Sequence, residues 1–263
     1  MRLIFLGTGT SIGVPAIGCD CPVCVSADPL NKRRRASLYV ETAGLQIIID
    51  TPPDFREQVL AFKIKRLDAV LYTHAHVDHI LGFDDIRRFN QVQKESIPIY
   101  GSSETLADIS RIFPYIHQPE KPGISYPRVL FNIVTEPFQI GGLNIMPIPV
   151  RHADIPTYGY RLEAEGRAFA YIPDCQELDE KAVARLQKLD LIILDTLRRR
   201  SHPTHFSLSQ SLAMLKKINA RESYLTHICH ELDHRQTNTE LPSGISLAHD
   251  GLVLNLCIGI SKR

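Results

Sequence analysis

Short apolar runs recur along the chain, most of them bounded by glycine, proline or polar residues. Runs of this length are typical of strands, whereas helices show apolar residues three or four positions apart over longer stretches. The pattern predicts strands at residues 2–6, 37–41, 45–49, 69–72, 97–100, 189–194, 223–225 and 252–257, with several more inside 129–150 and 157–172. The second and third runs are separated by Ala43-Gly44 and are therefore expected to form a hairpin.

Three helices are predicted between these strands. One begins after Pro52-Pro53, because proline is tolerated in a first helical turn, and the others span 104–112 and 208–218. Residues 7–28 hold too few apolar positions for a regular element, and residues 118–127 predict a loop or lid rich in proline and glycine. Strands and helices alternate throughout, so we expect an α/β protein with central sheets and outer helices.

Composition supports one ordinary globular domain spanning residues 1–263, because no linker, low-complexity tract or short repeat interrupts the pattern. Hydrophobic residues make up 44% and charged residues 22%, which excludes a disordered chain. The net charge of +1 gives no broad basic surface for nucleic acid or a membrane. No apolar run is long enough for a transmembrane helix, and the first residues lack the pattern of a signal peptide, so we expect a cytoplasmic location.

The strongest chemical signal is the segment His74-Ala75-His76-Val77-Asp78-His79, which directly follows a predicted buried strand. Alternation along an extended segment points His74 and His76 the same way, and a tightening turn can aim Asp78 and His79 at a neighbouring point. Imidazole and carboxylate together suit zinc, manganese or iron. A single histidine at a strand end is usually structural, but three histidines and an aspartate at this spacing indicate a metal site.

A second cluster is formed by three of the six cysteines, Cys19, Cys21 and Cys24. In a reducing compartment this spacing indicates a metal-binding loop, at about residues 18–28, rather than a disulfide framework. Structural zinc normally has four ligands, so a distant residue must complete the site, and His230 and His234 are both candidates. The alternative is a thiol loop without metal. The remaining thiols are most simply core or near-core residues: Cys175, Cys229 and Cys257.

The histidine segment resembles the HxHxDH signature of the metallo-β-lactamase superfamily of binuclear hydrolases, and the cysteine loop resembles that of PhnP-type phosphodiesterases. The resemblance implies an αββα sandwich of two mixed β-sheets flanked by helices, with ligand loops along one edge. It also implies two divalent metal ions, manganese or zinc, and one structural zinc. The first metal would be bound by His74, His76 and His152. The second would be bound by Asp78, His79 and His227, with Asp174 bridging the pair.

The same resemblance implies roles for further residues. His230 would complete the cysteine site, and Asp50 would support the histidine loop through hydrogen bonds, although Asp50 could equally cap the helix after Pro52. His205 would reach the centre to stabilise phosphoryl oxygens or protonate the leaving alkoxide, unless it only bonds backbone at a helix start. Asp78 could orient His205 while binding metal. Arg198, in a basic run, could attract an anionic substrate or simply lie on the solvated surface.

Two cations about 3.5–4 Å apart can lower the pKa of a shared water and neutralise charge on a phosphoryl or carbonyl oxygen, so the expected reaction is hydrolysis. The known PhnP-type enzyme opens 5-phosphoribosyl 1,2-cyclic phosphate during phosphonate breakdown, so the resemblance implies a small cyclic ribose phosphodiester as substrate. Alternatives with the same fold are a tRNA-processing endonuclease, a thioesterase-like hydrolase and a noncatalytic PqqB-like relative. The near-zero net charge argues against an RNA substrate. A homodimer is the default oligomer.

Overall fold

The computed structural model describes residues 1–119 and 122–256, and its strands form two sheets of seven strands each. The first sheet has the order β14-β1-β2-β3-β4-β5-β6. Its strands are β1 (Arg2–Gly7), β2 (Ser37–Thr42), β3 (Leu45–Ile49), β4 (Ala69–Leu71), β5 (Ile97–Gly101), β6 (Val129–Ile133) and β14 (Val253–Asn255).

The second sheet has the order β13-β12-β11-β10-β9-β8-β7. Its strands are β7 (Phe138–Ile140), β8 (Leu143–Val150), β9 (Thr157–Ala164), β10 (Arg167–Ile172), β11 (Leu191–Asp195), β12 (Glu222–Thr226) and β13 (Ile245–Leu247). Both sheets are mixed, because β3 to β6 and β10 to β13 run parallel while the remaining pairs are antiparallel.

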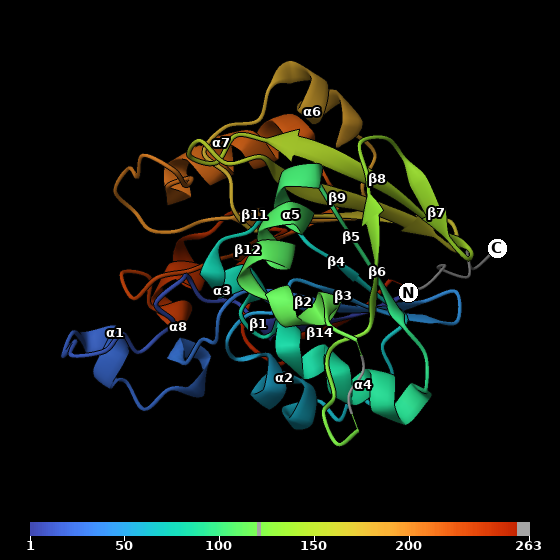
Figure 1. Cartoon of the computed structure of the whole chain (residues 1–263). Helices are drawn as coiled ribbons and strands as arrows, with labels where there is room; N and C mark the ends of the chain where they lie inside the picture. Colours follow the sequence, from blue (N-terminus) through green and yellow to red (C-terminus); the bar gives the residue numbers. More distant parts are fainter. Residues whose placement is uncertain (120–121, 257–263) are drawn as a thin grey trace.

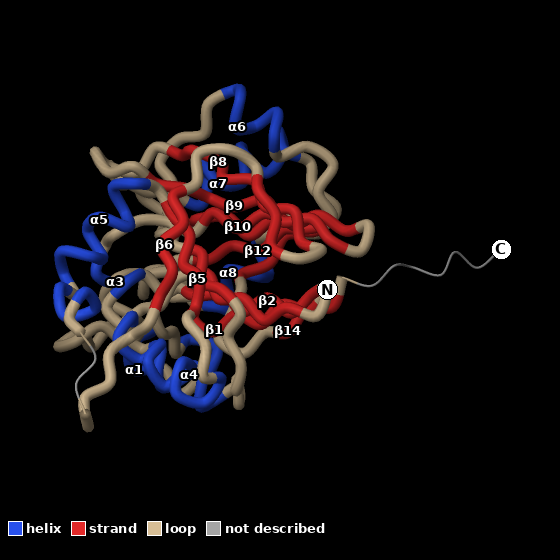
Figure 2. The backbone as a smooth tube through the Cα atoms, turned by 45° about the vertical axis from the view of Figure 1, so that its right-hand side comes forward, coloured by secondary structure: helices blue, strands red, loops and turns tan. Residues whose placement is uncertain are grey.

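Helices lie outside the two sheets (Figures 1 and 2). They are α1 (Pro22–Val25), α2 (Phe55–Ala61), α3 (Val77–Ile80), α4 (Ile86–Gln93), α5 (Ser103–Ile112), α6 (Glu180–Arg185), α7 (Leu208–Ile218) and α8 (His234–Glu240), with 3-10 turns η1 (Pro29–Asn31), η2 (Phe83–Asp85) and η3 (Pro114–His117). None of these helices is long and apolar enough to cross a membrane.

Three apolar layers hold this arrangement together. The inner layer lies between the sheets and combines fully buried residues of both, such as Phe5 and Ile47 with Tyr160 and Phe169. A second layer joins the outer face of the first sheet to α2, α4 and α5, and a third joins the outer face of the second sheet to α6 and α7. Central strands that are buried on both faces explain why β10 and β11 read as nearly continuous apolar runs. The expected αββα sandwich is confirmed.

The strand predictions held where burial is complete, and the helix spanning 208–218 has the expected ends, because Ser207 forms a capping box with Gln210. Pattern reasoning missed α4, α6, α8 and β13. Helix α8 has the sequence HRQTNTE, which contains no apolar residue to reveal a helical stripe. The segment expected to be irregular, 7–28, contains the short helix α1. The predicted last strand is confirmed only over Val253–Asn255, and Cys257 lies outside the described residues.

The parallel strands determine where the chemistry lies. Strands β3 and β4 of one sheet, and β10, β11 and β12 of the other, run parallel to their neighbours within each sheet. The carboxyl ends of parallel neighbours meet at one sheet edge, which is where α/β proteins place ligands. Short polar segments leave these ends and carry most of the predicted ligands. His152 instead follows β8, which runs in the same direction as β10 because both pair antiparallel with β9.

Candidate metal centres and active site

The first group of ligand atoms comes from three separate loops. His74 and His76 follow β4, His152 follows β8, and Asp174 follows β10. His74 Nε2 lies 2.8 Å from His76 Nδ1, and His152 Nε2 lies 3.2 Å from that same atom. Asp174 Oδ2 lies 3.8 Å from His74 Nε2 and 3.5 Å from His152 Nε2. One ligand atom from each residue lies within 4.8 Å of the others, so the structure brings the first predicted set together.

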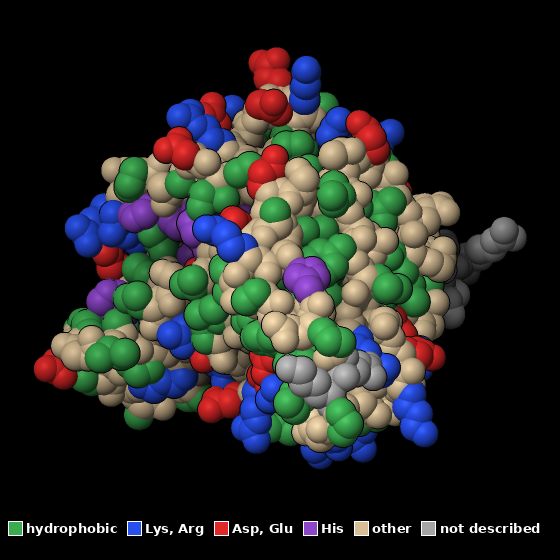
Figure 3. All heavy atoms as spheres, viewed as in Figure 1, with side chains coloured by type: hydrophobic (Ala, Val, Ile, Leu, Met, Phe, Trp, Pro, Cys, Tyr) green, Lys and Arg blue, Asp and Glu red, His purple; other side chains and the backbone are tan. Residues whose placement is uncertain are grey.

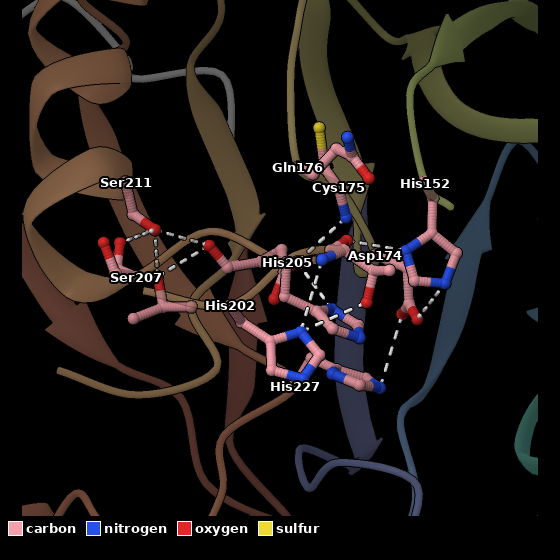
Figure 4. A network of polar contacts seen from close by, with 12 residues as sticks. His152, Asp174, Cys175, Gln176, His202, His205, Ser207, Ser211 and His227 are labelled. Carbon is pink, nitrogen blue, oxygen red and sulfur yellow. Dashed lines mark hydrogen bonds and ion pairs between the residues drawn. The ribbon is translucent and has the colours of Figure 1, made fainter. Parts of the chain in front are cut away.

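The second group forms on the other side of Asp174. Its Oδ1 atom lies 3.3 Å from His79 Nε2 and 3.4 Å from His227 Nε2. Asp78 Oδ2 lies 3.3 Å from His79 Nε2 and 3.6 Å from His227 Nε2. The two oxygens of Asp174 therefore face different ligand groups, which is the geometry expected of a bridging carboxylate. Figure 4 shows Asp174 between His152 and His227.

Hydrogen bonds on the far side of two rings, those of His79 and His152, fix which nitrogen faces the centre. Asp50 accepts a bond of 2.8 Å from His79 Nδ1–H, and the Thr204 carbonyl accepts one of 2.8 Å from His152 Nδ1–H. A neutral imidazole with its proton on Nδ1 turns an unprotonated Nε2 inward. Asp50 also accepts bonds from the Thr73 backbone and hydroxyl, each of 2.8 Å. Asp50 therefore supports the histidine loop, and the N-cap of α2 is Asp54 instead.

The backbone after the histidine loop packs closely against the segment that follows Asp50. Gly82 lies three residues after His79, and a Cβ there would lie 2.2 Å from the Pro52 carbonyl, so only glycine allows this approach. Asp50 and His227 both have positive φ angles, of 65° and 59°. Residues other than glycine adopt this conformation at a cost of about 1–3 kcal/mol, and such strain concentrates at functional sites.

The charge state of the group suits a cation. Burial lowers the pKa of His74 well below its ordinary range and that of His152 to about 4, so both rings are neutral at pH 7. Burial alone would raise the pKa of Asp78, but the charge of His79 and the nearby His227, whose Nε2 lies 3.6 Å from Asp78 Oδ2, hold it well below its ordinary value. These rings and the Asp78 carboxylate thus have the protonation state that metal ligands need. Burial would lower the pKa of His79 too, but the carboxylates of Asp174, Asp78 and Asp50 raise it well above its ordinary value, so this ring must release a proton when a metal binds.

Several buried atoms at the centre lack any hydrogen-bond partner among the described residues: His79 Nε2, Asp174 Oδ1, and Nδ1 and Nε2 of His227. An unsatisfied buried polar atom costs about 1–3 kcal/mol, so a fold rarely gathers several in one place. A divalent cation in the second group would satisfy His79 Nε2, Asp174 Oδ1 and His227 Nε2, which face one another there. The donor set of imidazole and carboxylate fits zinc or manganese, and the residues present therefore fit the pair of metals that the superfamily implies.

His205 lies beside the second group but is held by a partner that the sequence did not reveal. Its ring stacks on His227, with ring centroids 4.7 Å apart, and its Nδ1–H donates to Asp195 Oδ2 at 2.9 Å. The expected orienting residue, Asp78, instead faces His79 and His227, and no bond among the described residues joins it to His205. That expectation was wrong. Asp195 directly ends a buried strand, as Asp50 follows one, and this shared pattern was the missed signal.

Burial would lower the pKa of His205, but the carboxylates of Asp195 and then Asp174 raise it to about 9. The imidazole is therefore protonated at neutral pH. Because Asp195 holds Nδ1–H, the second proton is on Nε2. The ring also packs edge-on against His152, with centroids 4.7 Å apart, so this proton lies next to both ligand groups.

The cysteine cluster forms a separate group. The Sγ atoms of Cys19, Cys21 and Cys24 lie 3.2, 3.3 and 3.4 Å from His230 Nδ1. The other candidate, His234, is turned away, with its Nδ1 3.1 Å from the buried Arg33 guanidinium. Three thiols and an imidazole match the donor set of structural zinc. His227 and His230 thus face different groups although only two residues separate them.

Arg198 lies near His202, where its charge, after burial and His205, helps to lower the pKa of that ring, and it is only partly paired with other groups. Its Nη2 donates to the Ser201 carbonyl at 2.9 Å, while its Nη1 lies 3.9 Å from Glu231. Arg200 holds that same Glu231 in a two-pronged ion pair. Figure 3 shows histidine side chains gathered in a hollow on one side of the molecule, with Lys and Arg side chains beside them.

The sequence pattern of the beta-lactamase superfamily domain matches residues 46–228, which is more than half of the chain. The chain belongs to this superfamily. A solved structure described as a new diphosphatase from the PhnP family is 41% identical, with a TM-score of 0.89 and 98% of both chains covered. Within the superfamily the chain is therefore PhnP-like, as its cysteine loop predicted, and the fold and ligand groups make it a metal-dependent hydrolase.

Two further relatives differ in name. A protein of Porphyromonas gingivalis called octanoyltransferase is 35% identical over 96% of this chain. The chain spans only 51% of that relative's length. Zinc-bound PqqB from Methylobacterium extorquens is 23% identical, with a TM-score of 0.81, 97% of this chain and 100% of that chain covered, and shares the fold.

Proposed function

We propose that this protein is a binuclear metal-dependent phosphodiesterase that opens a small cyclic ribose phosphodiester. The observation that carries the proposal is the carboxylate of Asp174, whose two oxygens face two different ligand groups beside His205, a ring that Asp195 holds in place through Nδ1–H. The name of the PhnP-family diphosphatase, 41% identical over nearly the whole chain, supports phosphoryl chemistry. A related cyclic phosphate, 5-phosphoribosyl 1,2-cyclic phosphate, is the first substrate to test.

The ligand residues would hold manganese or zinc in two positions. His74, His76, His152 and Asp174 would hold the first ion, and Asp78, His79, His227 and Asp174 would hold the second. A bound pair supplies an ionised water and neutralises charge on the phosphoryl oxygens. Cys19, Cys21, Cys24 and His230 would hold a structural zinc, which keeps the segment after β12 in place.

The residues of the chain supply the remaining requirement, a proton for the leaving group. Breaking one P–O bond of a cyclic diester releases an alkoxide, and the water oxygen takes its place on phosphorus. His205 holds a proton on Nε2, and Asp195 stabilises the imidazolium until transfer. Asp195 also accepts a bond of 2.8 Å from the Cys175 backbone, which fixes the carboxylate in position. Arg198 would attract the anionic substrate to the rim.

An acyl ester or thioester is the second candidate substrate, because the relative from Porphyromonas gingivalis, of whose length this chain spans 51%, is named for acyl transfer. The same centre could polarise a carbonyl oxygen. The position of His205 favours the phosphodiester over a thioester, since an alkoxide is a poor leaving group that needs a proton, whereas a thiolate leaves without one. An acyl ester also releases an alkoxide, so the choice between ester and phosphodiester is left to the experiment.

The experiment compares three substrates with protein loaded with manganese or zinc. We expect turnover of 5-phosphoribosyl 1,2-cyclic phosphate, followed by ³¹P NMR as a cyclic diester becomes a monoester, and slower turnover of bis(p-nitrophenyl) phosphate. Hydrolysis of p-nitrophenyl acetate should stay at background. The variant Asp174→Ala should abolish turnover, and Asp190→Asn, which alters a carboxylate at the far end of β11, should not. Rapid acetate hydrolysis without diester cleavage would overturn the proposal in favour of acyl chemistry.

A further inference from the structure

His202 lies at the rim of the metal centre and has no role in the proposed chemistry so far. Its ring centroid lies 5.2 Å from that of His205, and its side chain is partly exposed. Figure 4 shows His202 beside His205 and His227. Its ring belongs to neither ligand group of the described residues. A partly exposed histidine at this place is accessible to a substrate but is not a metal ligand.

The hydrogen bonds of His202 determine where its proton lies. The Thr204 backbone N–H lies 3.3 Å from His202 Nδ1, and the Thr204 hydroxyl lies 3.1 Å from the same atom. A backbone N–H can only donate, so Nδ1 must be the acceptor and the ring proton is on Nε2. Within the described chain no group accepts a hydrogen bond from this Nε2–H. His202 therefore presents a donor of fixed tautomer that is open to a ligand.

Thr204 couples this donor to the metal centre. Its carbonyl accepts the bond from His152 Nδ1–H, while its N–H and hydroxyl hold the ring of His202. Thr204 thus orients both histidines: its carbonyl holds the predicted metal ligand His152, and its N–H and hydroxyl hold His202. Such a double attachment keeps the distance between the centre and the rim donor nearly constant, which is the property of a preorganised binding site.

The positions of the histidine rings indicate which part of a substrate would meet the Nε2–H of His202. His205 packs against His152 and His227, and His202 lies next to His205 on the more exposed side. A substrate whose leaving oxygen receives the His205 proton extends its leaving group outward past His202. Burial, the nearby His205 and the positive charge of Arg198, in that order, lower the pKa of His202. The His202 ring is therefore neutral at pH 7, although Arg198 lies close to it.

We propose that His202 forms a leaving-group subsite, in which its Nε2–H donates a hydrogen bond to an oxygen acceptor next to the ester oxygen. The inference rests on the proposed function and narrows its substrate class. Sugar-like leaving groups carry hydroxyl, ring or phosphate oxygens at this position. An aryl leaving group such as p-nitrophenol carries none beside its ester oxygen, so it gains nothing from His202.

Two amide variants test the proposal, because they place a donor at different ends of the imidazole. The side-chain nitrogen of His202→Gln can reach the position of Nε2, whereas that of His202→Asn reaches only the position of Nδ1. We expect His202→Asn to lower kcat/KM for 5-phosphoribosyl 1,2-cyclic phosphate by about tenfold to a hundredfold, and His202→Gln to recover most of that loss. With bis(p-nitrophenyl) phosphate both variants should stay within about twofold of wild type.

A binding measurement separates this inference from the proposed function. Ribose 5-phosphate serves as a probe of the subsite in calorimetric titrations of the metal-loaded protein, and its affinity should fall in His202→Asn and persist in His202→Gln. The control is His117→Asn, an exposed histidine bonded to Ser110, which should change neither measurement. If wild type cleaves neither diester, the proposed function fails and the ribose 5-phosphate affinities alone decide. Equal effects of both amides, or equal losses on both diesters, would overturn the subsite.

Discussion

The partnership between His205 and Asp195 allows the most exacting test of the site, because one buried carboxylate sets the charge of the predicted acid. The side chain of Asp195 is fully buried and that of His205 is 11% exposed, so solvent screens their interaction little. Burial lowers the pKa of His205, yet Asp195 and Asp174 raise it from 6.5 to about 9. The difference corresponds to about 3 kcal/mol in favour of the imidazolium.

The variant Asp195→Asn keeps the shape of the side chain and removes its charge. We expect the pKa of His205 to fall clearly below its wild-type value of about 9, because the largest source of its increase is removed and only the contribution of Asp174 remains. The assay is an NMR titration of the histidine rings in metal-free protein, with the His205 signal assigned by its loss in His205→Gln. The matched control is Asp250→Asn, another buried carboxylate that accepts bonds from the Thr8 and Arg34 backbone, and it should leave His205 unchanged.

The same pair makes a signed prediction for stability. A histidine whose pKa is raised in the folded state stabilises the fold fully below its unfolded value, near 6.5, and this contribution is lost as the pH rises through about 9. Metal-free wild type should therefore lose unfolding free energy between these pH values, and Asp195→Asn should lose much less. A His205 titration that stays near pH 9 in the variant would refute the electrostatic reasoning.

Three further tests address the metals. Asp50→Ala leaves His79 Nδ1–H without its acceptor and should weaken zinc binding, measured by calorimetry, about tenfold to a hundredfold. The control variant Asp54→Asn, at the start of α2, should bind zinc normally. Equal zinc affinities of the two variants would show that Asp50 does not support the site. His230→Ala should remove the cysteine-bound zinc and also reduce turnover, because His227 lies on the same segment. The control variant His234→Ala should retain both the zinc and the turnover. Zinc retained in His230→Ala would contradict the assignment of His230 as the fourth ligand. Elemental analysis should find about three metals per chain and about one in Asp174→Ala, and an unchanged count would exclude the bridging role.

Much of the site was predictable because its signals are local. His74 to His79 follow one strand and fold back within a single turn of α3, so their spacing alone indicates convergence. The three cysteines lie on one short loop for the same reason. His152, Asp174 and His227 were reached through family resemblance, and the structure brings them to the same centre because the strands before them end at one edge of the sandwich.

Other features depend on contacts that no sequence pattern records. The choice of His230 over His234 required knowing which face of a segment meets a loop more than 200 residues earlier. The support of His205 by Asp195, and of His152 by the Thr204 carbonyl, likewise joins different loops. Every residue has a backbone carbonyl, so no sequence pattern can indicate that the Thr204 carbonyl is the one that holds His152.

By itself, the amino-acid sequence determined the alternation of buried strands and outer helices, and the ligand chemistry of two short segments, because both follow from the periodicity and composition of neighbouring residues. Only the tertiary structure decided which distant side chains hold the ligands and where each proton lies. The physical reason is that tautomers and pKa values depend on burial and on partners in space, and packing two sheets face to face is what sets those partners.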